Sequence, residues 1–162
     1  MLCCMAMLAR TIAEARLYMD LQPCEACGYL GFAGSMATAR AVVRFSGQCS
    51  RCKAVREFTF RLPDEAYEGF GGANPSELLD PGEWLVVADL AARHSPVPDA
   101  ADYALAAAAI DEVLKFIPSG ADVVPPEALH TATGRAAYEH EPGRFHKTRL
   151  AAVADAYRKH LR

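Results

Sequence analysis

The sequence predicts an α+β protein, in which a small cysteine-held β-hairpin packs on an array of about four α-helices. A short additional helix precedes the hairpin. Two Cys-x-x-Cys pairs, at residues 24–27 and 49–52, are separated by 21 residues, and strand-like alternation flanks the second pair. Apolar residues at helical spacing then recur between prolines. We expect an N-terminal helix in 1–22, the hairpin in 23–62, a loop in 63–75 and the helical domain in 76–162, all as one compact unit.

The first helix is predicted from Thr11 to about Leu21. Thr11 and Glu14 have the spacing of a capping box, in which each side chain binds a backbone N–H of the other residue. Pro23 then ends the helix. Cys3 and Cys4 precede it and could carry a lipid or bind metal, although an unimportant frayed terminus is the simpler expectation.

The two cysteine pairs predict one tetrahedral metal site. Each pair supplies two thiolates from one tight turn, and four thiolates are a ligand set of structural zinc. The ligands would be Cys24, Cys27, Cys49 and Cys52. Because four protein ligands leave no open coordination position, the ion would support the fold and catalyse no reaction. A thioredoxin-type redox pair and two intramolecular disulfides remain as alternatives.

Residues 23–62 resemble the zinc-ribbon group of folds. The run Pro-Cys-Glu-Ala-Cys-Gly at residues 23–28 matches the usual knuckle pattern. The second pair departs from that pattern, because Lys53 stands where glycine is common. The resemblance implies a structural zinc ion and a local fold. It implies no particular function, since zinc ribbons occur in transcription factors, ribosomal proteins, enzymes and adaptors.

Two strands are expected around the second cysteine pair. One runs from Thr38 to Phe45 and is followed by a turn at Ser46-Gly47. The other runs from Val55 to Leu62, with Phe58 and Phe60 on one face. A hairpin of this size is not stable alone, so zinc and docking on the helices would have to stabilise it.

Four helices are expected after the loop. The first begins at Asp80, with Pro81 in its first turn, and ends before Pro96. The others span Asp99 to Ile117, Pro125 to about Tyr138, and the residues after Gly143.

Charge is strongly segregated although the net charge is only −3. Residues 39–61 hold six basic residues and one acidic residue, residues 62–143 hold 15 acidic and three basic residues, and residues 144–162 again hold six basic and one acidic. The candidate partner-binding residues of the hairpin are Arg40, Arg44, Arg51, Lys53 and Arg56. They could bind nucleic-acid phosphates, with Phe45 or Phe58 as stacking faces, or face solvent or the protein's own acidic helices.

The sequence contains no GxSxG, no phosphate-binding GxxxxGK[ST] loop and no GxGxxG after a strand. We therefore expect a non-enzymatic zinc protein that binds another protein, as an adaptor, an accessory subunit or a toxin-neutralising partner. A nucleic-acid-binding regulator is the main alternative, and an enzyme with an unrecognised site is another.

Composition also predicts where the protein works. Six cysteines without a signal peptide, and without an apolar stretch of about 20 residues, predict a reducing cytoplasm and no membrane partner. The 13 arginines against four lysines favour a bacterial source of high GC content.

Overall fold

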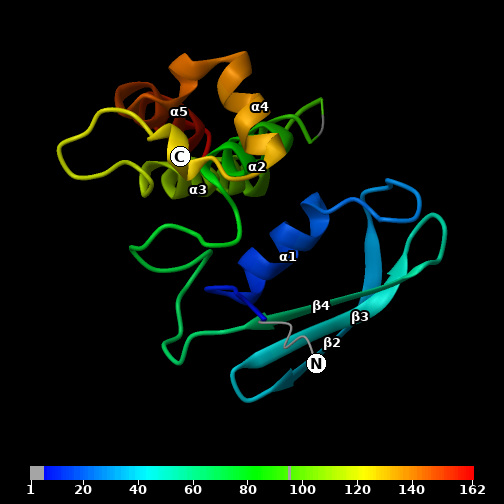
Figure 1. The fold of residues 1–162 in the computed structure, drawn as a ribbon. Coiled ribbons are helices and arrows are strands. Elements are labelled where there is room, and N and C mark those ends of the chain that lie inside the picture. Colours follow the sequence, from blue (N-terminus) through cyan, green and yellow to red (C-terminus); the bar gives the residue numbers. More distant parts are fainter. Residues whose placement is uncertain (1–5, 95) are drawn as a thin grey trace. The chain divides into compact units, whose positions relative to one another are not determined.

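The computed structural model describes residues 6–94 and 96–162 and divides the chain into two compact units, which are separated between Gly72 and Ala73. The boundary falls in the loop predicted at 63–75. The described residues form a four-stranded sheet and five α-helices, which confirms the α+β class (Figure 1). Docking of the hairpin on the helices as one compact unit stays a prediction. Cys3 and Cys4 lie outside the described residues.

The first unit is a sheet with one helix against it. Its elements are β1 (Met7–Leu8), α1 (Ile12–Leu21), β2 (Phe32–Ala39), β3 (Val42–Cys49) and β4 (Val55–Arg61). The strand order is β1-β4-β3-β2, with β1 parallel to β4 and the other pairs antiparallel. α1 lies across one face of the sheet (Figure 1), where the Tyr18 ring meets the Phe60 ring edge-on at a centroid distance of 5.8 Å.

Aromatic residues of β3 and β4 form the core under α1. Phe45 and Phe60 are buried, and the Phe60 ring stacks on Phe58 with 6.4 Å between centroids. Because side chains alternate along a strand, Arg44 and Arg61 lie on the opposite side of the sheet. Both are exposed, and we call this side the open face.

The predicted strand from 38 to 45 is wrong, because the chain reverses inside it. Arg40 and Ala41 join β2 to β3, and Arg40 has a φ of 54°, a conformation that glycine or asparagine usually supplies in such turns. Gly47, expected in a turn, lies within β3 opposite Gly34 of β2. A Cβ added to Gly34 would lie 2.8 Å from the Cα of Gly47, so the missing side chains allow the two strands to approach.

α1 forms one half of the predicted capping box. The Thr11 hydroxyl accepts a hydrogen bond from the Glu14 backbone N–H at 3.1 Å. The Glu14 carboxylate binds Arg10 instead of Thr11, accepting from the Arg10 backbone N–H at 2.6 Å and from Nε at 2.9 Å. Both side chains are buried, so an ion pair fixes the start of α1.

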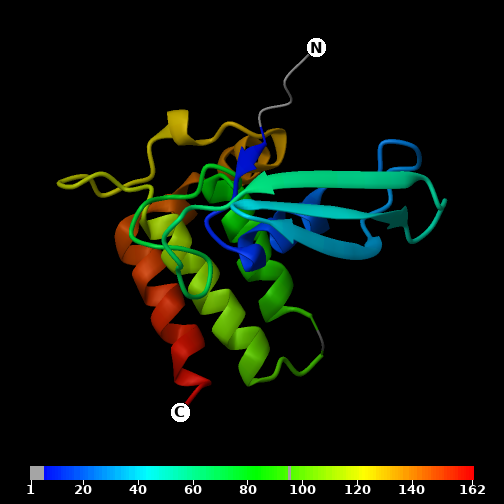
Figure 2. The ribbon, with the colours of Figure 1, turned by 90° about the horizontal axis from the view of Figure 1, so that it is seen from below.

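The second unit is helical. Its elements are α2 (Pro81–Ala92), α3 (Ala100–Leu114), α4 (Ala132–His140) and α5 (Lys147–Lys159), with short 3-10 helices η1 (Pro126–Ala128) and η2 (Pro142–Phe145). α3 packs against α2 and α5, which lies beside it in Figure 2, and α4 packs against α2. The core contains Trp84, Ile110, Phe145 and Leu150.

Capping boxes begin α2 at Asp80, as predicted, and α3 at Asp99. The predicted helix from Pro125 to Tyr138 is wrong in its first half. That half contains only η1, and α4 starts after its own N-cap, Thr131.

Candidate metal centre

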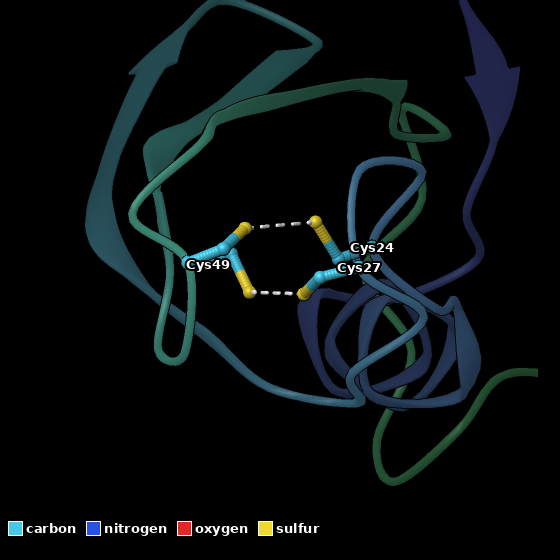
Figure 3. A group of neighbouring side chains, drawn as sticks. Cys24, Cys27 and Cys49 are labelled. Carbon is cyan, nitrogen blue, oxygen red and sulfur yellow. Dashed lines mark hydrogen bonds between the residues drawn. The ribbon is translucent and has the colours of Figure 1, made fainter.

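Four thiols from two turns meet at one end of the sheet. Two come from the loop between α1 and β2, and two come from the end of β3 and the turn that follows it. We call Cys24, Cys27, Cys49 and Cys52 the Cys4 cluster. The Sγ atoms of Cys24 and Cys52 are 3.7 Å apart, and those of Cys27 and Cys49 are 3.6 Å apart. All four sulfurs lie within 4.8 Å of one another, and Figure 3 shows Cys24 and Cys27 pointing toward Cys49.

These distances fit a single metal ion. Four sulfurs at about 2.3 Å from a tetrahedral zinc ion lie about 3.8 Å from one another. The distances of 3.6 Å and 3.7 Å are close to this value and far above the bond length of about 2.0 Å in a disulfide. The four cysteines are free thiols. The Cys4 cluster can therefore bind a metal ion such as zinc, and it contains no disulfide.

The backbone shapes the two turns alike. In the first, the Gly28 N–H donates to the Cys24 carbonyl at 2.7 Å, and Gly28 has a φ of 70°. In the second, the Lys53 N–H donates to the Cys49 carbonyl at 3.1 Å, and Lys53 has a φ of 64°. Lys53 thus adopts the left-handed conformation for which zinc knuckles commonly use glycine.

The second turn directs backbone N–H groups at the cluster. The Cys49 sulfur accepts hydrogen bonds from the backbone N–H of Cys52 and, more weakly, from that of Arg51. These bonds lower the pKa of Cys49 by more than burial raises it, so the pKa falls to about 6. The N–H of Ala54 lowers the pKa of Cys52, but the hydrogen-bonded thiol of Cys27, burial and the other two thiols raise it to about 11. The Cys49 sulfur thus ionises easily and the Cys52 sulfur resists, and a bound cation would favour the thiolate form of both.

Four of the five basic candidate residues are exposed, and Arg56 is the exception. Three of the exposed residues are spread from the turn before β3 to the turn after it. Arg40 is in the β2–β3 turn and Arg44 is on the open face, whereas Arg51 is in the second cysteine turn. The aromatic residues proposed as stacking partners are unsuitable. Phe45 is buried, and Phe58 stacks on Phe60 under α1.

The other two basic candidates bind backbone carbonyls of their own unit. Lys53 Nζ donates to the Ser50 carbonyl at 3.0 Å. Arg56 Nη2 donates to the Gln22 carbonyl at 2.9 Å, and its guanidinium lies 5.1 Å from the centroid of the Phe58 ring. Arg56 therefore links β4 to the end of α1.

Sequence reasoning missed a hollow of about 550 Å³ beside the cluster. It is lined by the end of α1, the first cysteine turn and the first half of β4. No local pattern could predict it, because its walls come from segments about 30 residues apart.

Among the described residues, no helix has both the length and the apolar character needed to cross a membrane. The four-thiol geometry is what identifies this candidate metal centre, since no family model, curated protein or solved structure matches the chain.

Proposed function

We propose that the chain is a zinc protein whose first unit is a zinc ribbon, and that it works by binding another protein. It would act as an adaptor, an accessory subunit or a toxin-neutralising partner. The zinc assignment is supported by the four sulfurs at tetrahedral spacing. Four protein ligands fill the coordination shell of zinc, so the ion supports the fold.

Zinc supplies stability that this unit needs. A four-stranded sheet with one strand of two residues and one helix has a small core. A structural zinc ion in a small domain contributes about 10–16 kcal/mol of apparent binding energy to folding. The ion joins the loop before β2 to the turn between β3 and β4, so it closes the sheet at one end.

Exposed apolar side chains beside the cluster carry the protein-binding proposal. Tyr29 and Leu30 follow the first cysteine turn and are 44% and 53% exposed, and Val55 follows the second turn and is 75% exposed. A Cβ on Gly31 would lie 2.8 Å from the Tyr29 ring and 3.3 Å from the Ser50 hydroxyl, so the two turns are neighbours. Large apolar side chains exposed together typically mark a protein-binding surface.

A second candidate function, nucleic-acid binding, is favoured by the open face. Arg44 and Arg61 are exposed there on adjacent strands, and Arg40 lies at its end. They could contact phosphates, although no aromatic side chain of β3 or β4 lies on this face to stack on bases. Binding of this kind would weaken steeply with salt, which titration of a labelled DNA or RNA at two salt concentrations measures.

The test of the main proposal is affinity purification of the full chain from its own cells, with metal analysis and identification of the proteins that accompany it. We expect one zinc per chain and a partner that a chelator releases. Leu30→Ser should keep the zinc content and reduce the amount of partner that co-purifies. Leu90→Ser, at an exposed position in α2, should change neither quantity. Zinc with no partner would refute protein binding, and a chain without zinc would refute the zinc ribbon.

A further inference from the structure

We propose that the outer edge of β4 beside the Cys4 cluster binds an extended, basic segment of a protein partner, which adds to the sheet as a further strand. This inference rests on the proposed protein-binding function and gives that function a site and a partner chemistry.

The first half of β4 has one unpaired edge. β3 pairs with β4 along its whole length, from Val55 to Arg61. On the other side β1 pairs only with Phe60 and Arg61. In the part of the chain that the structure describes, no strand covers Val55–Thr59 on that side, and we call these residues the β4 edge. An uncovered edge presents backbone N–H and C=O groups to which an extended peptide can hydrogen-bond.

The hollow lies along this edge and gives the peptide a place. Its walls are Tyr18 of α1, the C-cap Gln22 and the following Pro23, residues 24–26 of the first cysteine turn, and residues 54–58. A strand seated about 4.8 Å from β4 would lie between the edge and α1. Its side chains would alternate, facing Phe58 under α1 on one side and Val55 on the open face on the other.

The charges around the hollow favour a basic segment. Glu25 and Glu57 line it and are exposed, and the last turn of α1, which carries no basic residue, adds the partial negative charge of a helix C-terminus. Four thiolates with one zinc ion would add a charge of about −2. Among the described lining residues the single basic side chain is Arg56, which donates to the Gln22 carbonyl.

The hollow at the other edge of the sheet favours neither a basic nor an acidic partner. The hollow of about 360 Å³ beside β2 is lined by one basic and one acidic residue, Arg16 and Asp20, and otherwise by apolar residues and glycine. The β4 edge is therefore the surface with a definite partner chemistry.

The experiment uses the zinc-loaded full chain and fluorescent eight-residue peptides. The probe alternates Lys and Val, a second peptide alternates Glu and Val, and a third is the Lys-Val peptide with N-methyl groups on alternate backbone nitrogens. Fluorescence anisotropy should show binding of the Lys-Val peptide, and at least tenfold weaker binding of the other two. Glu57→Lys should weaken binding of the Lys-Val peptide at least tenfold. Glu68→Lys should leave this binding unchanged, because Glu68 does not line the hollow.

Four results would overturn the inference. Equal binding of the N-methylated peptide would exclude strand addition, and equal binding of the Glu-Val peptide would exclude the charge preference. If a variant that begins at Ala6 binds the peptide and the full chain does not, the occupant of the β4 edge would be the chain's own first five residues and not a partner. A partner captured equally by the parent chain and Glu57→Lys would place docking elsewhere and leave the proposed function intact.

Discussion

The carboxylate of Asp80 binds Thr131, although the two residues are 51 positions apart in the sequence. Asp80 Oδ2 accepts from the Thr131 backbone N–H and from its hydroxyl, each at 2.8 Å, while Oδ1 accepts from the Glu83 N–H at 2.9 Å. Asp80 is fully buried. Since Asp80 and Thr131 are the N-caps of α2 and α4, one carboxylate joins the first turns of two helices.

Asp80→Ala should therefore cost more than an ordinary cap. Loss of an N-cap costs about 1 kcal/mol. The stranded Thr131 donors should add about 1 kcal/mol each, for a total of about 3 kcal/mol. Urea unfolding followed by the fluorescence of the single, buried Trp84 measures this loss in the second unit.

The matched control is Asp99→Ala. Asp99 caps α3 through the same capping-box geometry, but its side chain is exposed. Its recorded hydrogen bonds are with Asp102 of α3 and with no residue of another helix. It should cost about 1 kcal/mol. Equal losses for the two variants would mean that the bonds to Thr131 add nothing.

Gly134→Ala should destabilise the second unit although alanine favours helices. Helix propensity alone predicts a gain of about 1 kcal/mol. A Cβ on Gly134 would lie 2.1 Å from both Asp80 carboxylate oxygens, which cannot yield without breaking their hydrogen bonds. We expect a net loss of about 1–3 kcal/mol in urea unfolding. Gly143→Ala, whose Cβ would meet only the Arg149 guanidinium at 3.4 Å, is the control and should be nearly neutral.

Glu83→Gln should stabilise the second unit increasingly as the pH rises. Burial raises the pKa of Glu83, and the negative charge of Asp80 raises it further. The hydrogen bond from the Asp80 backbone N–H and the nearby His130 lower it, but the net shift is upward. The folded unit thus keeps a proton that the unfolded chain releases above about pH 4.3, so stability is lost as the pH rises past that value. Glutamine does not titrate. The stability difference between variant and parent should grow from pH 4 to 7, and a constant difference would contradict the raised pKa.

Cys24→Ser and Cys52→Ser should each unfold the first unit. Either change removes a thiolate from the Cys4 cluster, and with it the zinc-dependent part of folding. Zinc per chain should fall well below that of the parent, and amides of β3 and β4 should lose protection from hydrogen exchange. Trp84 fluorescence should still report a folded second unit, and Ser50→Ala should behave as the parent. Full zinc content with normal melting in the serine variants would contradict the assignment.

Arg40→Gly and Arg40→Ala together isolate backbone strain in the β2–β3 turn. Both remove the arginine charge, but only glycine adopts a φ of 54° without a steric cost. The left-handed conformation costs other residues about 1–2 kcal/mol. The glycine variant should therefore be more stable than the alanine variant by about 1 kcal/mol. Thermal unfolding of the zinc-loaded chain measures the difference, and equal midpoints would mean that the turn relaxes.

The sequence could predict features that depend on residues close together in the chain. The cysteine pairs predicted the Cys4 cluster because each turn supplies two thiols within four residues. Asp80 predicted the start of α2 because a cap acts on the next three residues. The β2–β3 turn was missed because arginine, at position 40, is not a residue typical of turns. Gly47 is typical of turns, but it lies within β3, where it allows close approach to Gly34 of β2.

Features that depend on distant segments were not predictable. Glu14 binds Arg10, which is only four residues away, but the burial of this pair depends on how the rest of the unit packs around it, and the local pattern favoured Thr11 as the partner. The hollow at the β4 edge requires α1, the first cysteine turn and β4 to be placed first. The direction in which Arg56 extends also follows from a contact between distant segments, with the Gln22 carbonyl.

The position of the Cys4 cluster has a consequence during synthesis. All four cysteines and all four strands precede Gly72, and Ala73–Arg162 follow. At a translation rate of about 5–20 residues per second, the ribosome needs several seconds more to make those residues. If the Cys4 cluster binds zinc as proposed, the first unit can capture the ion while the rest of the chain is still being made. The zinc available during synthesis would then determine the fraction of new chains whose first unit folds correctly.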